Sequence, residues 1–227
     1  MKKIHKIVLT GGPCAGKTAV LSALKDRFGD DLVIIPEVAT QLLEIPYDQG
    51  GPGVPGRDLP WSQEWQDRFQ KMVTEKQLAD ETYQVTATDV VADGRNRPMV
   101  IVCDRGILDG AAYVGDRDVF LKQFGLNLDD CFALYDKVIH LNSVAVDDPQ
   151  KYEELKATNP SRFEDADEAT KLDNALFAVY EGHPNHIRVG AGEGIETKIE
   201  TVFQEIEAML ESTEHREVGS IESPEKT

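Results

Sequence analysis

The chain has 227 residues and a formal net charge of −17. That length fits one medium-sized domain with a substantial core, and the negative charge argues against nucleic acid or an anionic membrane surface as the main partner. The three cysteines show neither disulfide nor zinc-site spacing, and no apolar stretch reaches the length of a membrane span. We therefore expect a cytoplasmic protein with no nucleic-acid or membrane partner.

Short apolar runs alternate with helical patterns along the chain, which indicates an α/β domain with a parallel sheet. Strands are predicted at Ile4–Leu9, Leu32–Ile35, Met99–Cys103, Lys137–Leu141 and His186–Val189. Helices are predicted at Lys17–Phe28, Val38–Leu43, Ser62–Thr88, Asp129–Leu134, Asp165–Tyr180 and Glu196–Leu210, with shorter helical pieces after Leu108 and around Val119–Phe124. Residues 1–210 are therefore interpreted as a single domain.

The segment between the first strand and the first helix carries the most specific motif. It fits the phosphate-binding P-loop pattern G-x-x-x-x-G-K-[ST] with Gly11, Gly12, Pro13, Cys14, Ala15, Gly16, Lys17 and Thr18. Its glycines let backbone N–H groups point at phosphate oxygens, and the following helix adds the positive end of its dipole. Lys17 is expected to reach the β- and γ-phosphates, and the Thr18 hydroxyl to ligate Mg²⁺. The strand and helix on either side favour this reading over an ordinary glycine-rich turn. ATP is the expected nucleotide, with GTP left open.

Glu37 lies just past the second predicted strand, after Pro36. At that place in a P-loop domain, a carboxylate overlooks the pocket of a phosphoryl acceptor and can orient or deprotonate an attacking hydroxyl. The alternative is that Glu37 only caps the helix that begins at Val38.

Two charged residues follow the third predicted strand. Asp104 ends that strand, which is the Walker B arrangement, so its carboxylate is expected to hold Mg²⁺ or a water bound to it. Its alternative role is to cap the next turn. Arg105 comes next, where side chains face the ligand crevice and a guanidinium suits phosphate. A salt bridge with Glu37 or Asp109 is the alternative for Arg105.

Three segments interrupt the alternation of strands and helices. Residues 47–60 are rich in glycine and proline and are expected to form an irregular loop on the acceptor side. Residues 143–163 are polar and charged and are expected to form a lid over the phosphates. Residues 211–227 are acidic with little apolar content, so a flexible tail is predicted there.

The predicted lid contains three basic residues, Lys151, Lys156 and Arg162. On a closing lid, such residues stabilise the charge of a transferring phosphoryl group. The alternative for each is an ordinary solvent-exposed charge.

Four apolar residues recur at helical spacing immediately after the glycine- and proline-rich loop: Trp61, Trp65, Phe69 and Met72. This spacing favours a stripe that packs against the core. A stacking face for a ring-bearing acceptor, with Arg68 and Gln70 reading its polar groups, is the alternative.

These motifs together resemble a known family. The P-loop, the run Pro36–Ala39 and the run Cys103–Tyr113 look like a family of AAA-like P-loop domains that includes the ribosylnicotinamide kinase domain of NadR-type proteins. Tyr135–Leu141 matches the fourth strand of that family, and Arg162–Glu164 resembles its lid. The pair Asp104–Arg105 also resembles the Asp-Arg motif of thymidylate kinases and, more remotely, the Glu-Arg-Ser motif of deoxynucleoside kinases.

The resemblance implies a three-layer P-loop NTPase fold, a parallel five-stranded sheet in the order 2-3-1-4-5, and lid insertions. It also implies residue roles: Asp104 beside Mg²⁺, Arg105 on the acceptor or donor phosphates, Glu37 orienting the acceptor hydroxyl, and Arg162 as the lid arginine. The loop 47–60 matches no motif of the family.

The predicted function is transfer of the γ-phosphoryl group of ATP to a small acceptor such as a nucleoside, a nucleotide or nicotinamide riboside, with Mg²⁺ as cofactor. The alternatives are a P-loop ATPase that acts as a nucleotide-driven switch on a protein partner, and a nucleotide-binding protein without turnover. Neither the acceptor nor the oligomeric state follows from the sequence.

Overall fold

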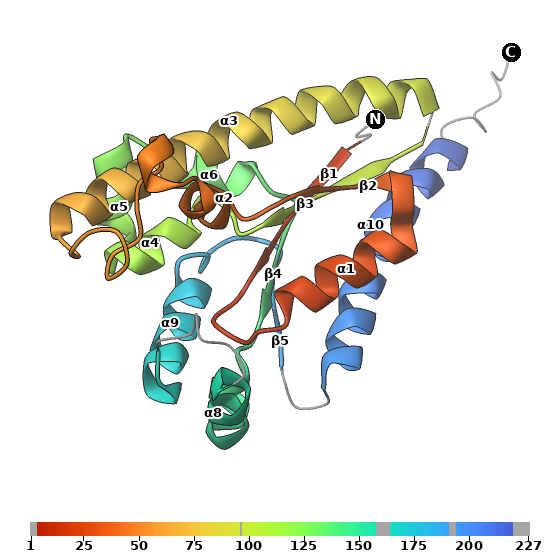
Figure 1. The fold of residues 1–227 in the computed structure, drawn as a ribbon. Coiled ribbons are helices and arrows are strands. Elements are labelled where there is room, and N and C mark those ends of the chain that lie inside the picture. Colours follow the sequence, from red (N-terminus) through yellow and green to blue (C-terminus); the bar gives the residue numbers. More distant parts are fainter. Residues whose placement is uncertain (1–3, 96, 158–163, 191–193, 220–227) are drawn as a thin grey trace, which may run out of the picture.

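Five parallel strands form the centre of the molecule (Figure 1). The computed structural model describes residues 4–95, 97–157, 164–190 and 194–219. The strands are β1 (Ile4–Thr10), β2 (Leu32–Ile35), β3 (Met99–Asp104), β4 (Lys137–Leu141) and β5 (His186–Val189). Their order in the sheet is β2-β3-β1-β4-β5, which confirms both the predicted strands and the predicted topology.

Ten α-helices of the described residues connect and cover the strands. They are α1 (Lys17–Phe28), α2 (Val38–Glu44), α3 (Gln63–Arg95), α4 (Asp109–Val114), α5 (Arg117–Phe124), α6 (Leu128–Ala133), α7 (Val144–Asp147), α8 (Pro149–Ala157), α9 (Ala166–Ala178) and α10 (Ile195–Gly219). In Figure 1, α1 and α10 run side by side on one side of the sheet, and α3 spans the other. The three layers are those of the predicted fold class.

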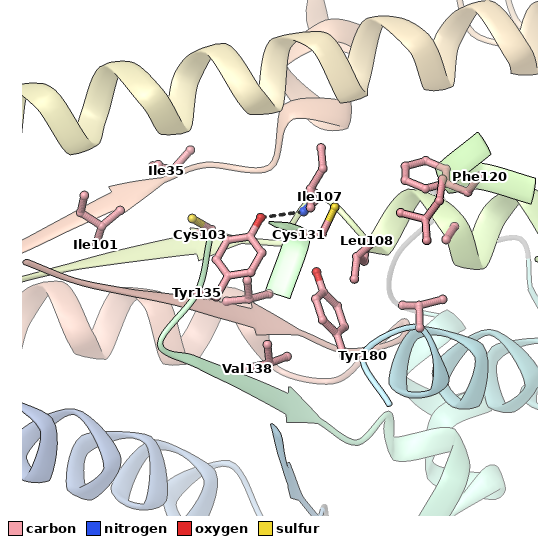
Figure 2. Packing of buried hydrophobic residues seen from close by; sticks show 14 of the residues in the cluster. Ile35, Ile101, Cys103, Ile107, Leu108, Phe120, Cys131, Tyr135, Val138 and Tyr180 are labelled. Carbon is pink, nitrogen blue, oxygen red and sulfur yellow. Dashed lines mark hydrogen bonds between the residues drawn. The ribbon is translucent and has the colours of Figure 1, made fainter. Parts of the chain in front are cut away.

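Strand side chains alternate between the two faces of the sheet, as the period of two requires. In β3, Ile101 and Cys103 face a cluster that includes Phe120 (Figure 2), whereas Val100 and Val102 face the cluster built with α1 and α10. Because helices cover both faces, most residues of β3 are apolar and buried, which explains why a short apolar run located this strand from the sequence.

The pairing of β1 with its two neighbours positions the site. Leu9 of β1 lies opposite Asp104 of β3, and Thr10 lies opposite His140 of β4. In a parallel sheet the carboxyl ends of the strands share one edge, where ligands bind. The loops that follow β1, β3 and β4 therefore converge.

Two predicted segments contain helices. Residues 143–163, predicted as a lid, contain α7 and α8. The flexible tail was predicted to begin at residue 211, whereas α10 continues to Gly219. Low apolar content prevents a segment from packing, but it does not end a helix. No glycine or proline lies between Glu211 and Val218 to do so.

None of the described helices is both long enough and apolar enough to cross a membrane.

Candidate functional site

The P-loop curls between β1 and α1 as the motif predicts. Gly11 and Gly16 have φ values of 147° and 90°, in the region that glycine adopts without strain. A Cβ on Gly11 would lie 2.2 Å from the Leu141 carbonyl oxygen, so this position also needs glycine for the close approach to β4. The loop, with Lys17 and Thr18, lines a cavity of about 620 Å³, hereafter the P-loop cavity.

Asp104 lies beside the P-loop lysine. Its Oδ1 is 3.9 Å from Lys17 Nζ, and this buried oxygen has no hydrogen-bond partner among the described residues. Burial raises the pKa of Asp104, and Lys17 opposes that shift. Burial, aided by the neighbouring Arg105, lowers the pKa of Lys17. A buried carboxylate oxygen without a partner among the described residues, next to the lysine of the P-loop motif, fits a hard divalent cation such as Mg²⁺.

Arg105 lies between two cavities and lines both. Its φ of 73° is in the left-handed region, which is uncommon for a residue other than glycine and is typical of functional positions. Its Nε donates to Glu37 Oε1, and its Nη1 lies 3.4 Å from the Gly11 carbonyl oxygen and 3.3 Å from Asp109 Oδ1. The salt bridges considered as alternatives for Arg105 are thus present, and they hold it in the crevice.

Glu37 occupies the N-cap position of α2, but its carboxylate makes no capping hydrogen bond. It accepts from Arg105 Nε and, at 3.0 Å, from Thr40 Oγ1. Burial would raise the pKa of Glu37, but the charges of Arg105 and Lys17 outweigh burial and lower it. Glu37 is therefore a carboxylate at neutral pH, as an acceptor-orienting residue must be.

Asp109 is a buried residue whose importance the sequence analysis missed, since it entered only as an alternative partner for Arg105. Its carboxylate accepts hydrogen bonds from the Thr10 hydroxyl, from Gly106 N at 2.9 Å and from the Tyr180 hydroxyl at 2.7 Å. These bonds join β1, the turn after β3 and the residues just after α9 around one carboxylate. The role depends on residues far apart in sequence, so no local pattern signals it.

A second cavity of about 540 Å³ lies on the other side of Arg105, hereafter the acceptor cavity. Its walls come mainly from α2, α3 and α4. Trp65 and Phe69 line it and stack with ring centroids 5.0 Å apart and an angle of 10° between their planes. The buried Gln70 also lines it.

The apolar stripe predicted from Trp61 to Met72 packs against the core in part, because Phe69 and Trp65 belong to an apolar cluster with Val38 and Leu42. Trp65 and Phe69 line a cavity, whereas Trp61 and Met72 are exposed to solvent. Arg68 is also exposed, pairs with Glu64 and does not line the cavity.

The predicted acceptor-side loop, residues 47–60, lies against the wall of this cavity. The Pro52 carbonyl oxygen of the loop accepts from Trp65 Nε1 at 3.0 Å. The loop itself contributes no described lining residue, so it supports the wall rather than forming it.

The predicted lid reaches the P-loop cavity, which Lys151 on α8 lines. Glu164, the residue directly after the predicted lid, lines the acceptor cavity. Lys156 lies 4.0 Å from Glu153 and lines neither cavity, in keeping with a surface charge. Arg162 lies outside the described residues.

Two further residues, Asp173 and Lys198, form hydrogen bonds with the main chain of the P-loop. The sequence analysis did not predict them. Asp173 on α9 accepts from Gly12 N at 2.9 Å and from Ser143 N at 2.8 Å. Lys198 on α10 donates to the Ala15 carbonyl oxygen at 2.9 Å. Both side chains are buried and act on the main chain of the loop, a role that a search for catalytic residue patterns does not detect.

A P-loop between β1 and α1, a carboxylate at the end of β3 and the sheet order β2-β3-β1-β4-β5 define a P-loop NTPase domain. A family model described as "AAA domain" matches residues 6–197, and the chain belongs to this family.

Among solved structures, the chain is similar to a deoxyadenosine kinase from M. mycoides with bound dATP. The two are 16% identical with a TM-score of 0.49, and the match covers 89% of this chain and 99% of the other. No curated protein matches the chain.

Proposed function

We propose that this protein is an ATP-dependent kinase that transfers the γ-phosphoryl group to a hydroxyl of a small, ring-bearing acceptor such as a nucleoside. One observation carries the proposal: a second cavity adjoins the P-loop cavity, and Arg105 lines both. A domain that used water as its acceptor would have no need for a second cavity of about 540 Å³ at this place.

Some residues of the site bind the phosphate donor, ATP, and others act on the acceptor. The P-loop amides and Lys17 bind the ATP phosphates, and Arg105 stabilises negative charge on the transferring group. Glu37 orients the acceptor hydroxyl and accepts its proton as the hydroxyl attacks. Arg162 is proposed to add a further positive charge from the lid. Thr18 and Asp104 would hold Mg²⁺, which would supply charge neutralisation on the phosphates.

The lining of the acceptor cavity favours an acceptor without a phosphate of its own. Among the described lining residues Arg105 is the one cation, and it is already paired with Glu37 and Asp109. Glu164 adds another carboxylate at the wall. A monophosphate carries nearly two negative charges, so at this wall it would have to share Arg105 with Glu37, Asp109 and the transferring phosphoryl group. The stacked Trp65 and Phe69 suit a flat ring.

The test is phosphoryl transfer from γ-labelled ATP with Mg²⁺ to matched pairs of nucleosides and their monophosphates, with nicotinamide riboside included. We expect label on one of the unphosphorylated acceptors and little on its monophosphate. Label on the monophosphate alone would overturn the charge argument. Free labelled phosphate, released at one rate whatever acceptor is present, would overturn the kinase proposal in favour of an ATPase switch.

A further inference from the structure

Two side chains from outside the nucleotide site hold the backbone turn that carries Arg105. The Arg105 carbonyl oxygen accepts from Gln77 Nε2 at 3.2 Å. Two residues later, Ile107 N donates to the Tyr135 hydroxyl at 2.8 Å, the dashed line in Figure 2. Gln77 comes from α3 and Tyr135 from the residues just before β4, so two separate elements fix the turn.

Both of these side chains meet the same buried carboxylate. Oε1 of Glu81, one helical turn after Gln77 on α3, accepts from Gln77 Nε2 at 2.7 Å and from the Tyr135 hydroxyl at 2.8 Å. Oε2 of Glu81 accepts from Lys6 Nζ of β1 at 2.8 Å. Glu81 is 2% exposed, and a charge buried this deeply persists only when it is paired and hydrogen-bonded.

The Glu81 carboxylate fixes the orientation of both side chains because it can only accept hydrogen bonds. The Gln77 amide must turn its NH₂ group toward Glu81, which leaves the second N–H for the Arg105 carbonyl. A flipped amide would place its oxygen against two acceptors. The Tyr135 hydroxyl must likewise donate its proton to Glu81, so its oxygen is left to accept from Ile107.

We propose that Gln77 and Tyr135, both anchored on Glu81, are positioning residues for Arg105. They hold the left-handed backbone of Arg105 and so place its guanidinium between the P-loop and Glu37. Gln77 also lines the acceptor cavity, so α3 forms the wall for the acceptor and fixes the cation shared by the two cavities. The expected effect on rate rests on the proposed function, whereas the placement of Arg105 can be measured without it.

The first variant is Gln77→Met, which keeps the length of the side chain, removes both donors and leaves Lys6 paired with Glu81. Because small displacements of a catalytic group cost much in rate, we expect kcat for phosphoryl transfer to fall about 10- to 100-fold. The KM for ATP should stay within about twofold, since the P-loop is untouched. The matched control is Thr88→Val, also on α3 and 3% exposed, which lines neither cavity and should leave kcat unchanged.

The second readout is the NMR resonance of the Arg105 Nε–Hε group, which donates to Glu37. Its assignment follows from its loss in Arg105→Lys. We expect this resonance to move in Gln77→Met and to stay in place in Thr88→Val. Tyr135→Phe removes the hydroxyl that joins Ile107 to Glu81. It should move the same resonance by a smaller amount. This variant replaces Gln77→Met in the experiment if Gln77→Met does not fold.

The two readouts separate the possible failures. If the Arg105 resonance stays in place in folded Gln77→Met or Tyr135→Phe protein, the proposed positioning role is wrong, whatever happens to the rate. If the resonance moves but the wild-type protein transfers phosphate to no acceptor, the positioning role stands and the proposed function fails.

Discussion

The two cavities that meet at Arg105 are built in different ways. The P-loop cavity takes half of its lining from one continuous segment, residues 12–19, and the phosphate-binding groups of that segment are mostly backbone amides. The acceptor cavity is lined mainly by side chains from α2, α3 and α4. A site made of one segment leaves a motif in the sequence, whereas a site assembled from several helices does not. The P-loop cavity was therefore predictable from the sequence, and the lining of the second cavity was not.

The largest effect, and the first test of the P-loop cavity, is expected from removal of the P-loop lysine. We expect Lys17→Ala to lower kcat/KM for ATP by about 10²–10³-fold, because it removes a preorganised positive charge from the phosphates. The fold should be retained, since the backbone of the loop is held by Asp173 and Lys198. Lys25→Ala, an exposed lysine on the same helix, is the matched control. Near-normal turnover by Lys17→Ala would show that the P-loop assignment is wrong.

The next largest effect should come from Glu37, on the acceptor side of Arg105. We expect Glu37→Gln to reduce transfer to the acceptor by about 10²-fold, because the amide cannot accept the hydroxyl proton. Titration with a fluorescent ATP analogue should show nearly unchanged nucleotide binding. If Glu37→Gln instead weakens nucleotide binding and leaves transfer intact, Glu37 belongs to the donor side.

Glu37 also sets an expectation for the pH dependence of the wild-type enzyme. Arg105 and Lys17 lower its pKa, so the carboxylate persists below about pH 4.3, the usual midpoint for glutamate. The midpoint of the loss of kcat/KM through protonation of Glu37 should therefore lie below that pH, and circular dichroism at each pH should be used to keep only data from folded protein. A midpoint at neutral pH would assign the limiting proton to another group.

A smaller and more selective effect is expected from the two tryptophans. Trp65→Ala removes the ring stacked on Phe69 and the donor to Pro52, so the KM for the acceptor should rise about tenfold. The KM for ATP should not change. Trp61→Ala, at a position where the side chain is 60% exposed, should change neither constant. Equal effects of the two substitutions would show that Trp65 does not contact the acceptor.

The smallest expected effect is a change in thermal stability on substitution of Asp104. We expect this substitution to raise Tm and to lower activity. Burial raises the pKa of Asp104, so the folded protein binds a proton there more tightly than the unfolded chain does. Stability is therefore lost as the pH rises through the titration of Asp104. Asp104→Asn should raise Tm at neutral pH by about 2–4 °C, corresponding to about 1 kcal/mol, and abolish most activity. A lower Tm at neutral pH would mean that the ion pair with Lys17 outweighs the cost of burial.

The sequence predicted the central strand β3 well because it is covered on both faces. Val100 and Ile101 point to opposite faces and are both buried, so Met99–Cys103 appears as an uninterrupted apolar run. The end of α10 was predicted less well. The helix continues past Leu210 to Gly219, and the sequence has no glycine or proline between Glu211 and Val218 that would end it.

The candidate site was predictable where a residue lies next to a strand end. Glu37, Asp104 and Arg105 each follow a buried strand of a parallel sheet, and the structure brings them together with Lys17. Asp109 and Glu81 could not be found in this way, because their importance comes from partners more than 50 positions away.

The most direct test of the proposed function is the dependence of ATP consumption on the acceptor. Initial rates of ADP formation should be measured with Mg²⁺-ATP alone and after addition of the best acceptor from the panel. We expect slow turnover without the acceptor and at least a tenfold rise with it, with ADP and phosphorylated acceptor formed in equal amounts. A rate that does not respond to the acceptor, with all label released as free phosphate, would contradict a kinase and identify water as the phosphoryl acceptor.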